Sequence, residues 1–273
     1  MSKFKELISV AYPPGNKPIF EEWLSENYNG CNTDRELIPV WFTSWWVNHN
    51  YGNDLAAKQE LQNFIDSLDR NKKYWTCVQY DDSVLIDFKD LDVLRFEMSK
   101  PIGIGLPLLC QPHPYKFISE KKWLASFVGS RTHPIRDELE KFKNSPDYFI
   151  SYERIDIDTY CRILHESIFA LCPRGYGSNS FRASEAMQYN VIPVFIGDEF
   201  IHPFDLKLYD YGVVIHSKHI EFLEEILDKI TPQEIEEKQR KCREIYEQYY
   251  TYTGCMDKII KSLDSEYHNR QSI

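Results

Sequence analysis

Residues Phe169–Gly197 read FALCPRGYGSNSFRASEAMQYNVIPVFIG, and this stretch carries the strongest indication of the fold. An apolar run is followed by the loop Pro173–Ser180, which contains two glycines, and then by a helical pattern that begins near Phe181. A second apolar run, Val191–Ile196, comes next. Serine and asparagine at the end of the loop are good residues for capping a helix. The stretch therefore predicts a strand, a loop, a helix and a strand, which is the βαβ unit of a parallel sheet.

The same alternation of short apolar runs and helical patterns continues along the chain. The runs predicted as strands are Leu37–Phe42, Tyr74–Val78, Val84–Phe88, Leu106–Leu109, Leu124–Val128, Tyr148–Ser151, Ile168–Cys172, Val191–Ile196 and Val213–Ile215. Near the end, apolar residues recur on one side of Ile220–Ile230, and Thr231–Glu234 has the sequence of a capping box that opens a further helix. Two prolines make Gln111–Tyr115 the best linker candidate. We therefore predict an α/β protein with two globular halves.

The composition excludes several classes of protein. With 273 residues, 42% of them hydrophobic, the chain can bury one large core or two smaller ones. Its formal charge of −10 argues against a general binder of nucleic acid or of anionic membranes, because the average field repels a polyanion. Seven cysteines without a C-x-x-C pair argue against a zinc site and against a disulfide framework.

The sequence also shows no sign of a secretory route. The opening MSKFKELISVAYPP lacks the basic segment, apolar run and small-residue cleavage site of a signal peptide. No apolar stretch approaches the ~18 residues that cross a bilayer. We therefore expect a soluble, cytoplasmic protein without a membrane span.

In this acidic chain, two loops that lead from a predicted strand into a helix hold four arginines: Arg131, Arg136, Arg174 and Arg182. In an open α/β sheet, ligands bind at the carboxyl ends of the strands, and a helix N-terminus attracts phosphate. Glu185 lies one helical turn beyond Arg182, where a carboxylate can accept hydrogen bonds from ribose hydroxyls. The chain has neither a P-loop sequence nor G-x-G-x-x-G, so the pattern predicts a nucleotide-diphosphate site of another kind.

Two simpler interpretations compete with this one. The glycines after Pro173 can form an ordinary turn, with Arg182 and Glu185 as a surface ion pair worth well under ~1 kcal/mol. Arg131 can equally belong to a solvated charged loop.

The quoted stretch resembles the nucleotide-sugar half of the exostosin family of glycosyltransferases. The resemblance rests on four segments: Phe169–Gly175, Ser180–Met187, Val191–Asp198 and Pro203–Phe204. It extends to Tyr209–Val214, to the helices on either side of Thr231, and to Ala125–Ser130 with Arg136. The N-terminal half resembles the family more weakly, through Ile8–Pro14, Ile38–Phe42, Trp75–Asp81 and Gly105–Leu108. Together these segments cover nearly the whole chain.

The resemblance implies the GT-B fold, in which two Rossmann-like domains face a cleft. Residues 1–117 would form the acceptor-side domain and residues 118–246 the nucleotide-sugar domain, with a C-terminal helix, 247–273, packing back on the first. The chain looks like the short, soluble members that algal giant viruses encode, one of which is a xylosyltransferase. As a viral protein it would work in the cytoplasm of the host cell.

The implied activity is an inverting transfer of a sugar from a UDP-sugar to a hydroxyl of a carbohydrate or glycan acceptor, which forms a β-glycosidic bond. UDP-xylose is the first expectation for the donor, while UDP-glucuronic acid, UDP-galactose and UDP-GlcNAc stay open. No cofactor and no metal are expected, because a GT-B enzyme can stabilise the departing diphosphate with arginines. Nucleic acid is not expected as a partner.

The family's donor site, carried over residue by residue, falls on Gly129, Arg131, Arg136, Arg174, Gly175, Ser178, Asn179, Ser180, Arg182 and Glu185. The arginines would hold the diphosphate, and the serines and the asparagine would supply N–H and side-chain donors. Glu185 would hold the ribose.

An inverting transfer also needs a base that deprotonates the acceptor hydroxyl. Asp81 follows the predicted strand Tyr74–Val78 and matches an aspartate of the family, and Asp82 and His113 are the alternatives, although Asp-Asp-Ser is also good turn chemistry. The rings of Trp45, Trp46 and His49 are candidates for contact with an acceptor sugar. The alternative is that these rings pack in the core.

Two rival functions stay open. Asp90–Asp92 and Asp156–Asp158 are D-x-D sequences, which hold Mn²⁺ or Mg²⁺ in metal-dependent GT-A glycosyltransferases. The other rival is a module that binds carbohydrate or nucleotide without turnover, because the base is the least certain assignment.

Overall fold

The computed structural model describes residues 4, 10–11, 16–99 and 101–271, with side chains up to residue 267. The chain divides into two compact units, Met1–Gln111 with Tyr252–Ile273, and Pro112–Thr251. The first division lies inside the segment predicted as a linker. Of the weakly similar segment Ile8–Pro14, only Val10 and Ala11 fall within the described residues.

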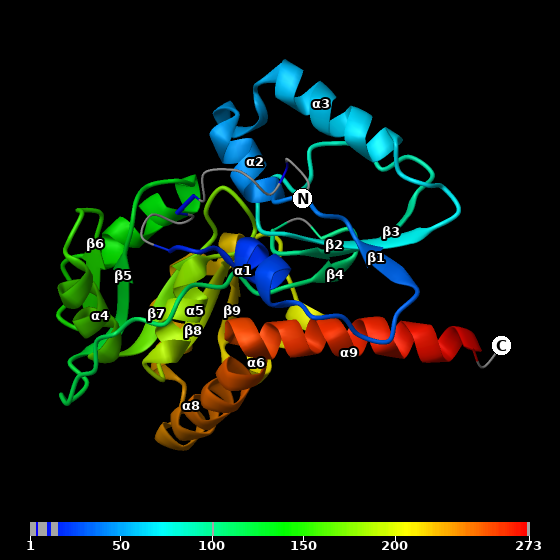
Figure 1. The fold of residues 1–273 in the computed structure, drawn as a ribbon. Helices are drawn as coiled ribbons and strands as arrows, with labels where there is room; N and C mark the ends of the chain where they lie inside the picture. The colour runs from blue at the N-terminus through cyan, green and yellow to red at the C-terminus, as the bar shows by residue number, and fades with distance from the viewer. Residues whose placement is uncertain (1–3, 5–9, 12–15, 100, 272–273) are drawn as a thin grey trace. The chain divides into compact units, whose positions relative to one another are not determined.

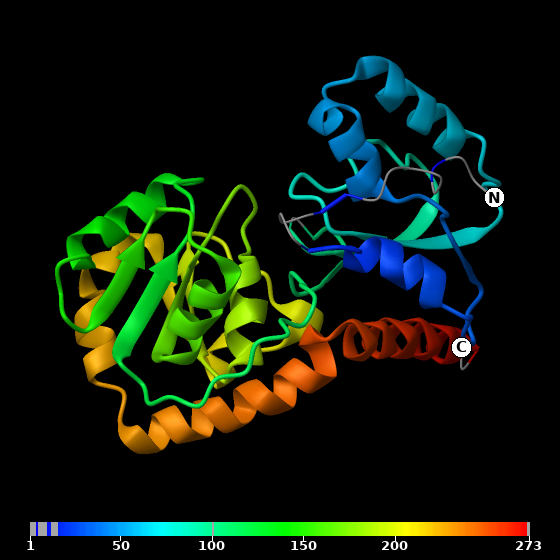
Figure 2. The ribbon, with the colours of Figure 1, turned by 60° about the vertical axis from the view of Figure 1, so that its left-hand side comes forward.

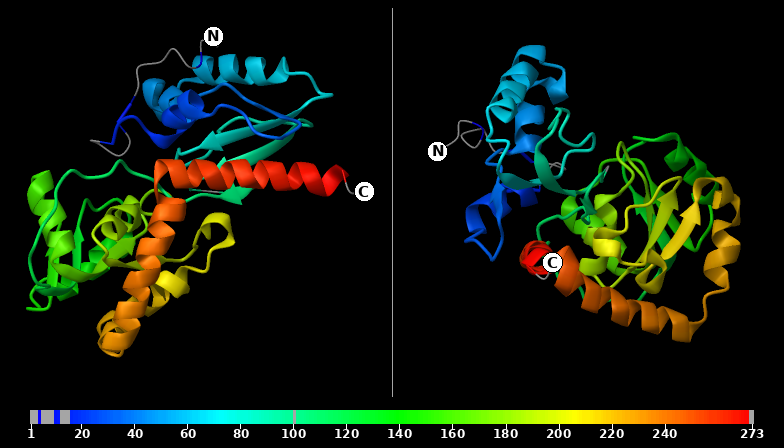
Figure 3. Two further views of the ribbon diagram at one scale, coloured as in Figure 1. Left: turned by 60° about the horizontal axis from the view of Figure 1, so that its bottom comes forward. Right: turned by 90° about the vertical axis from the view of Figure 1, so that its right-hand side faces the viewer.

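The first unit has a four-stranded sheet in the order β1-β2-β3-β4, in which every neighbouring pair is parallel. The strands are β1 (Arg35–Leu37), β2 (Lys73–Val78), β3 (Asp92–Glu97) and β4 (Ile104–Gly105). The helices are α1 (Phe20–Asn27), α2 (Phe42–Asn48), η2 (Asn50–Gly52), α3 (Leu55–Asp66) and α9 (Tyr252–Gln271). Helices α2 and α3 cover one face of the sheet, and α1 and α9 lie on the other (Figures 1 and 3).

The central strand β2 is buried on both faces from Tyr74 to Val78, which explains why this part of its sequence is mostly apolar. Tyr74 and Val78 join the core under α2 and α3. On the opposite face, the ring of Trp75 lies 6.0 Å from that of Phe96 in β3. Helix α9 completes this second layer.

Helix α9 is held to the first unit by packing and by charge. The ring of Tyr252 lies 5.3 Å from that of Phe20 in α1, and the Tyr252 hydroxyl donates to the Pro18 carbonyl at 3.0 Å. Near its other end, Glu266 accepts two hydrogen bonds from the Arg35 guanidinium, both at 2.7 Å. The last helix of the chain is therefore part of the unit formed by the chain's beginning.

The second unit has a five-stranded parallel sheet in the order β6-β5-β7-β8-β9, with helices on both faces (Figure 2). Its strands are β5 (Trp123–Val128), β6 (Tyr148–Ser151), β7 (Ser167–Pro173), β8 (Ile192–Gly197) and β9 (Val213–His216). Its helices are η3 (Pro134–Phe142), α4 (Ile157–His165), α5 (Phe181–Gln188), η4 (Pro203–Asp205), α6 (Leu208–Tyr211), η5 (Ser217–Phe222), α7 (Leu223–Asp228), α8 (Pro232–Ile245) and η6 (Tyr246–Tyr250).

The strand order of the second unit has a switch point between β5 and β7. The chain runs from β5 outward to β6 in one direction, and from β7 through β8 to β9 in the other. In doubly wound sheets of this order, the loops that follow the two strands at the switch point separate and leave a crevice at their carboxyl ends. These loops are the two that hold the arginines singled out above.

The predicted fold class is confirmed: both units are α/β with parallel strands. Strands β2 and β5 to β9 lie where the apolar runs predicted them, and Thr231 with Glu234 forms the predicted capping box at the start of α8. Among the described residues, no helix combines the length and the apolar character needed to cross a membrane.

Three strand predictions in the first unit are wrong. Val84–Phe88 is a turn region in which Leu85 has a φ of 52°, Leu37–Phe42 contains only the end of β1, and Leu106–Leu109 follows β4. Val84 and Phe88 are apolar because the turn packs into the core under α2 and α3. In these segments the apolar side chains are explained by their burial in the core, and the backbone does not form a strand.

Candidate functional site

Three arginines lie at the switch point of the second unit, and we refer to Arg136, Arg174 and Arg182 as the arginine group. Arg136 is in η3, which follows the loop after β5; Arg174 directly follows β7; Arg182 is in the first turn of α5. The local sequence explains the start of η3, because Pro134 occupies its first turn and the His133 side chain accepts a hydrogen bond from the Ile135 N–H.

Arg136 connects the two loops at the switch point. Its Nε donates to the Arg174 carbonyl at 3.0 Å, its Nη1 to the Ser130 carbonyl at 2.8 Å and its Nη2 to the Pro173 carbonyl at 3.3 Å. The residue is only 8% exposed. Burial, and then the charge of Arg182, lower the pKa of Arg136 to about 10. The low pKa shows that the surroundings of Arg136 disfavour positive charge.

Arg182 is equally buried, at 7% exposure. Its Nη2 donates to the Val128 carbonyl, and its guanidinium lies over the Phe127 ring, 4.4 Å from the centroid. The guanidinium of Arg136 lies 5.8 Å from the same centroid. One aromatic ring of β5 therefore supports both cations.

Two glycines make room for these guanidinium groups. A Cβ on Gly129 would overlap Nη2 of Arg182, and a Cβ on Gly175 would come within 3.1 Å of Nη2 of Arg136. Both glycines belong to the predicted donor site. The structure gives a spatial reason for both glycines: a side chain at position 129 would displace Arg182, and one at position 175 would crowd Arg136.

Two members of the arginine group carry positive charge that no carboxylate among the described residues neutralises. Within the described part of the chain, neither Arg136 nor Arg182 has a carboxylate partner, whereas Arg174 pairs with Asp198 at 2.5 Å. The buried donors Arg174 Nε, Arg182 Nε and Thr132 Oγ1 also lack a partner among these residues. Because buried charges and unpaired donors are costly, the arrangement fits a bound anion.

The loop into α5 lies beside the arginine group. Ser180 stands at the N-cap position with extended backbone, but its side chain makes no capping hydrogen bond. Ser178 donates to a carboxylate oxygen of Glu199 at 3.4 Å, and Asn179 lies between these two serines. The predicted donor residues 178–180 thus lead directly into the helix that carries Arg182.

Glu185 does not pair with Arg182, so the interpretation as a surface ion pair is wrong. The Tyr160 hydroxyl, from α4, donates to Oε2 of Glu185 at 2.5 Å, and Oε1 lies 4.0 Å from Nε2 of His113. Burial raises the pKa of Tyr160 well above its ordinary value, so the phenol stays protonated and keeps its role as the donor. The carboxylate is therefore held in one orientation between α4 and α5.

His113, an alternative for the base, belongs to the second unit. Its Nδ1 lies 2.9 Å from the Cys161 sulfur, and its backbone N–H donates to Gln188 at 2.8 Å. Burial lowers the pKa of His113, although the Glu185 charge opposes this effect. His113 therefore lies close to Glu185, which is on the same helix as Arg182.

Arg131 does not join the arginine group. It pairs with Asp137 and Glu140, and its guanidinium lies 3.6 Å from the centroid of the Tyr152 ring. All of these partners lie on or near η3, and the Arg131 side chain is largely exposed. The structure supports the solvated-loop interpretation for this residue.

The predicted base lies in the first unit. Asp81 and Asp82 follow the carboxyl end of β2, as predicted, and Asp81 is half-buried whereas Asp82 is exposed. Ser99 donates to Oδ1 of Asp81 at 3.2 Å. A third carboxylate that the sequence did not indicate, Glu97, ends β3 and accepts the N–H of Ile102 at 2.7 Å. Glu97 is buried and holds a turn.

The aromatic residues proposed to contact the acceptor require a correction. Trp45 and Trp46 are 4% and 0% exposed and belong to the core under α2 and α3, so they cannot stack on a sugar. His49 packs on Trp45, with ring centroids 4.1 Å apart, and its Nδ1 bonds the Trp45 carbonyl at 2.7 Å. All three hold the helix in place.

The carboxylates of the D-x-D sequences have structural partners. Asp90 lies 3.4 Å from Arg70, and Asp92 pairs with Arg35 at 2.8 Å. Asp156 caps α4 by accepting the Thr159 N–H at 2.9 Å, while Asp158 pairs with Arg162 at 3.0 Å. Each of these four carboxylates therefore has a polar partner within the protein.

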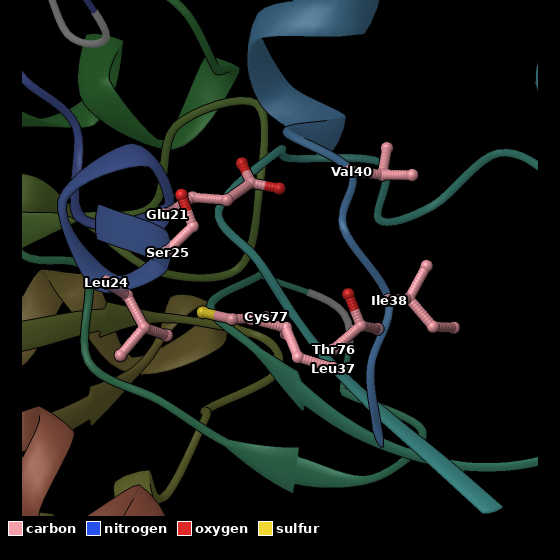
Figure 4. Close-up of a pocket in the computed structure, with 8 residues that line it drawn as sticks. All are labelled: Glu21, Leu24, Ser25, Leu37, Ile38, Val40, Thr76 and Cys77. Atoms are coloured by element: carbon pink, nitrogen blue, oxygen red, sulfur yellow. The ribbon is translucent and has the colours of Figure 1, made fainter. Parts of the chain in front are cut away.

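A small cavity in the first unit does not offer a comparable site. It has a volume of about 240 Å³ with its open side included, and Figure 4 shows its lining residues, Glu21, Leu24, Ser25, Leu37, Ile38, Val40, Thr76 and Cys77. Burial raises the pKa of Glu21 to about 8. Its carboxylate accepts the N–H groups of Phe42 at 2.7 Å and Thr43 at 2.9 Å. Both oxygens thus hold the start of α2.

The arginine group and its supporting residues lie at the switch point of the α/β unit and have the charge that an anion would need. Residues 97–230, which contain the whole group, match the family model of the Exostosin GT47 domain. Over these residues the chain is similar to the exostosin family.

Individual relatives match over different lengths. "Probable beta-1,4-xylosyltransferase IRX10L" of Arabidopsis thaliana is 38% identical over 103 residues, which are 37% of this chain and 24% of that protein. "Probable glucuronosyltransferase 47 A" of Physcomitrium patens is 36% identical over 103 residues, 37% of this chain and 22% of that protein. "Exostosin-1 homolog" of Caenorhabditis elegans is 24% identical over 248 residues, 70% of this chain and 65% of that protein. The chain thus spans about a quarter of the length of the first two relatives.

Proposed function

We propose that this protein is a glycosyltransferase that moves a sugar from a UDP-sugar to a hydroxyl of a carbohydrate acceptor, with inversion at the anomeric carbon. The observation that carries the proposal is the pair of buried guanidinium groups, Arg136 and Arg182, without a carboxylate partner among the described residues. A diphosphate supplies the missing negative charge. The similarity of residues 97–230 to the Exostosin GT47 domain supports sugar transfer as the reaction.

In this proposal each donor residue has one task. Arg136 and Arg182 bind the diphosphate, with Arg174 at its edge, while Ser178, Asn179 and Ser180 add polar donors. Charge-assisted hydrogen bonds of this kind contribute roughly 1.5–3 kcal/mol each. Glu185, oriented by Tyr160, accepts hydrogen bonds from the ribose hydroxyls.

The same arginines favour the chemical step. Negative charge grows on the diphosphate as its bond to the sugar breaks, and fixed guanidinium groups stabilise this charge more in the transition state than in the ground state. We therefore propose that the transfer needs no metal. Activity in excess EDTA tests this part, and loss of activity that Mn²⁺ or Mg²⁺ restores would favour the metal-dependent rival.

We assign the base to Asp81. Asp81 follows the carboxyl end of β2, its carboxylate is half-buried, and the Ser99 hydroxyl donates to Oδ1 and so orients the group. Asp81→Asn keeps the shape but removes the basic oxygen, so kcat should fall by about 10²–10⁴ with UDP affinity retained. Asp82→Asn is the matched control, and a collapse of turnover in that variant instead would transfer the role to Asp82.

Xylose is our first proposal for the transferred sugar, by similarity to the short viral members and to the relative named as a xylosyltransferase. The proposal as a whole is tested by calorimetry with UDP, ADP and GDP on the full chain. UDP should bind best, Arg182→Ala should lose most of this affinity, and Arg131→Ala should keep it. Binding of UDP without UDP release from any UDP-sugar in the presence of carbohydrate acceptors would indicate a binding module.

A further inference from the structure

We propose that the donor site selects an uncharged sugar and rejects a uronic acid, and that Asp198 and Glu199 make this choice. We call these two carboxylates the acidic rim. The proposal rests on the proposed function, because it concerns the sugar attached to the diphosphate. It bears on an open question, since the relatives include proteins named for xylosyl transfer and for glucuronosyl transfer.

The positive charge available to a ligand matches the diphosphate alone. Arg136 and Arg182 have no carboxylate partner in the described residues, whereas Arg174 already pairs with Asp198 at 2.5 Å. The diphosphate of a nucleotide sugar carries two negative charges, one for each of these two guanidinium groups. Arg131 adds nothing, because Asp137 and Glu140 pair with it.

The acidic rim contacts the loop between β7 and α5, which holds Arg174. Asp198 and Glu199 directly follow β8, and both are exposed. Asp198 reaches this loop through Arg174, and Glu199 reaches it through the Ser178 hydroxyl at 3.4 Å. Because Arg174 and Asp198 neutralise each other, the net charge that a third negative group on the ligand would meet here is the negative charge of Glu199.

Glu185 indicates which end of the donor meets the acidic rim. Its carboxylate is held on the side of α4, through Tyr160 and near His113. If the ribose lies on that side and the diphosphate lies at the switch point, the sugar lies beyond the diphosphate. There it meets the acidic rim, which contacts the arginine group through Arg174. The hydroxyls of an uncharged sugar can donate to these carboxylates, whereas a uronate is repelled by them.

The test compares two donors that differ in one group. UDP-glucose and UDP-glucuronic acid have the same ring and differ only in CH₂OH against carboxylate. We expect the full-length wild-type chain to bind UDP-glucose at least about 10-fold more tightly by calorimetry at low salt, since this ratio corresponds to a like-charge repulsion of about 1.4 kcal/mol. The ratio should shrink at high salt, because salt screens exposed charges.

Variants of the acidic rim decide whether it is the cause. Asp198→Asn with Glu199→Gln should bring the two affinities together while UDP itself still binds, because both amides keep hydrogen-bonding groups. Glu236→Gln, on the exposed surface of α8, removes one negative charge outside the site and should leave the ratio unchanged. Equal affinities in the wild type, or a ratio that survives in the double variant, would overturn the proposal. Absence of UDP binding would instead overturn the proposed function.

Discussion

Replacement of Arg182 by methionine should weaken ligand binding but leave the stability of the ligand-free protein nearly unchanged. Methionine retains an apolar stem over Phe127 and removes the charge. The loss of the hydrogen bond to the Val128 carbonyl costs about 1.5–3 kcal/mol, and the loss of the contact with Phe127 up to about 2 kcal/mol. The substitution also removes a buried cation, whose desolvation costs several kcal/mol, and its repulsion with Arg136.

These opposing contributions nearly cancel in the protein without ligand. We expect the free energy of unfolding to change by no more than about 1 kcal/mol, which corresponds to a shift in Tm of about 2–4 °C at most for a domain of this size. UDP binding, by contrast, should lose about 1.5–3 kcal/mol, a 10- to 150-fold rise in Kd. Thermal unfolding without ligand and calorimetry with UDP measure the two quantities separately.

Arg131→Met is the matched control, because Arg131 is exposed and its pairs with Asp137 and Glu140 contribute little. It should leave both the Tm and the UDP affinity near those of the wild type. Unchanged UDP affinity in Arg182→Met would remove Arg182 from the site. Severe destabilisation by that substitution would show that Arg182 is a structural residue whose charge is already compensated.

Three further outcomes are expected. Gly129→Ala should weaken UDP binding almost as much as loss of Arg182, because the added Cβ overlaps Nη2 of that side chain, and calorimetry on the folded variant measures it. Tyr160→Phe and Glu185→Gln should each reduce the preference for UDP over 2′-deoxy-UDP, because both substitutions alter the carboxylate assigned to the ribose. An unchanged preference in both variants would exclude that assignment. The pKa of Glu21 is about 8 in the folded protein and 4.5 in the unfolded chain. The folded protein therefore holds one more proton between these pH values, and the free energy of unfolding falls as the pH rises from about 4.5 to about 8. Glu21→Gln should make the free energy of unfolding, measured with urea, depend less on pH over this range.

The second unit was the more predictable one, and burial explains why. Strands β5, β7 and β8 lie inside a parallel sheet covered on both faces, so their sequences are nearly continuous apolar runs bounded by polar loops. In the first unit, strand β3 (Asp92–Glu97) contains charged residues and was missed. Val84–Phe88 is apolar and was mistaken for a strand, because its turn packs into the core.

The candidate site shows the same division. The sequence identified both arginine loops and the glutamate one turn into the helix, because phosphate-binding loops place arginines and glycines next to a helix start. It did not identify Tyr160 or Phe127, which hold Glu185 and the two guanidinium groups. Nothing in the local sequence of a tyrosine on one helix indicates that its hydroxyl meets a carboxylate on another.

By itself the sequence determined that the chain forms parallel α/β layers and that its cations gather in two loops after strands. Only the tertiary structure decided which cations act together. Arg131 and Arg136 stand five residues apart in one loop and helix start, yet the first pairs with surface carboxylates and the second is buried against the loop after β7. The reason is the strand order: β7 pairs with β5 across the switch point, and this non-local pairing brings the carbonyls of Pro173 and Arg174 to one of the two arginines.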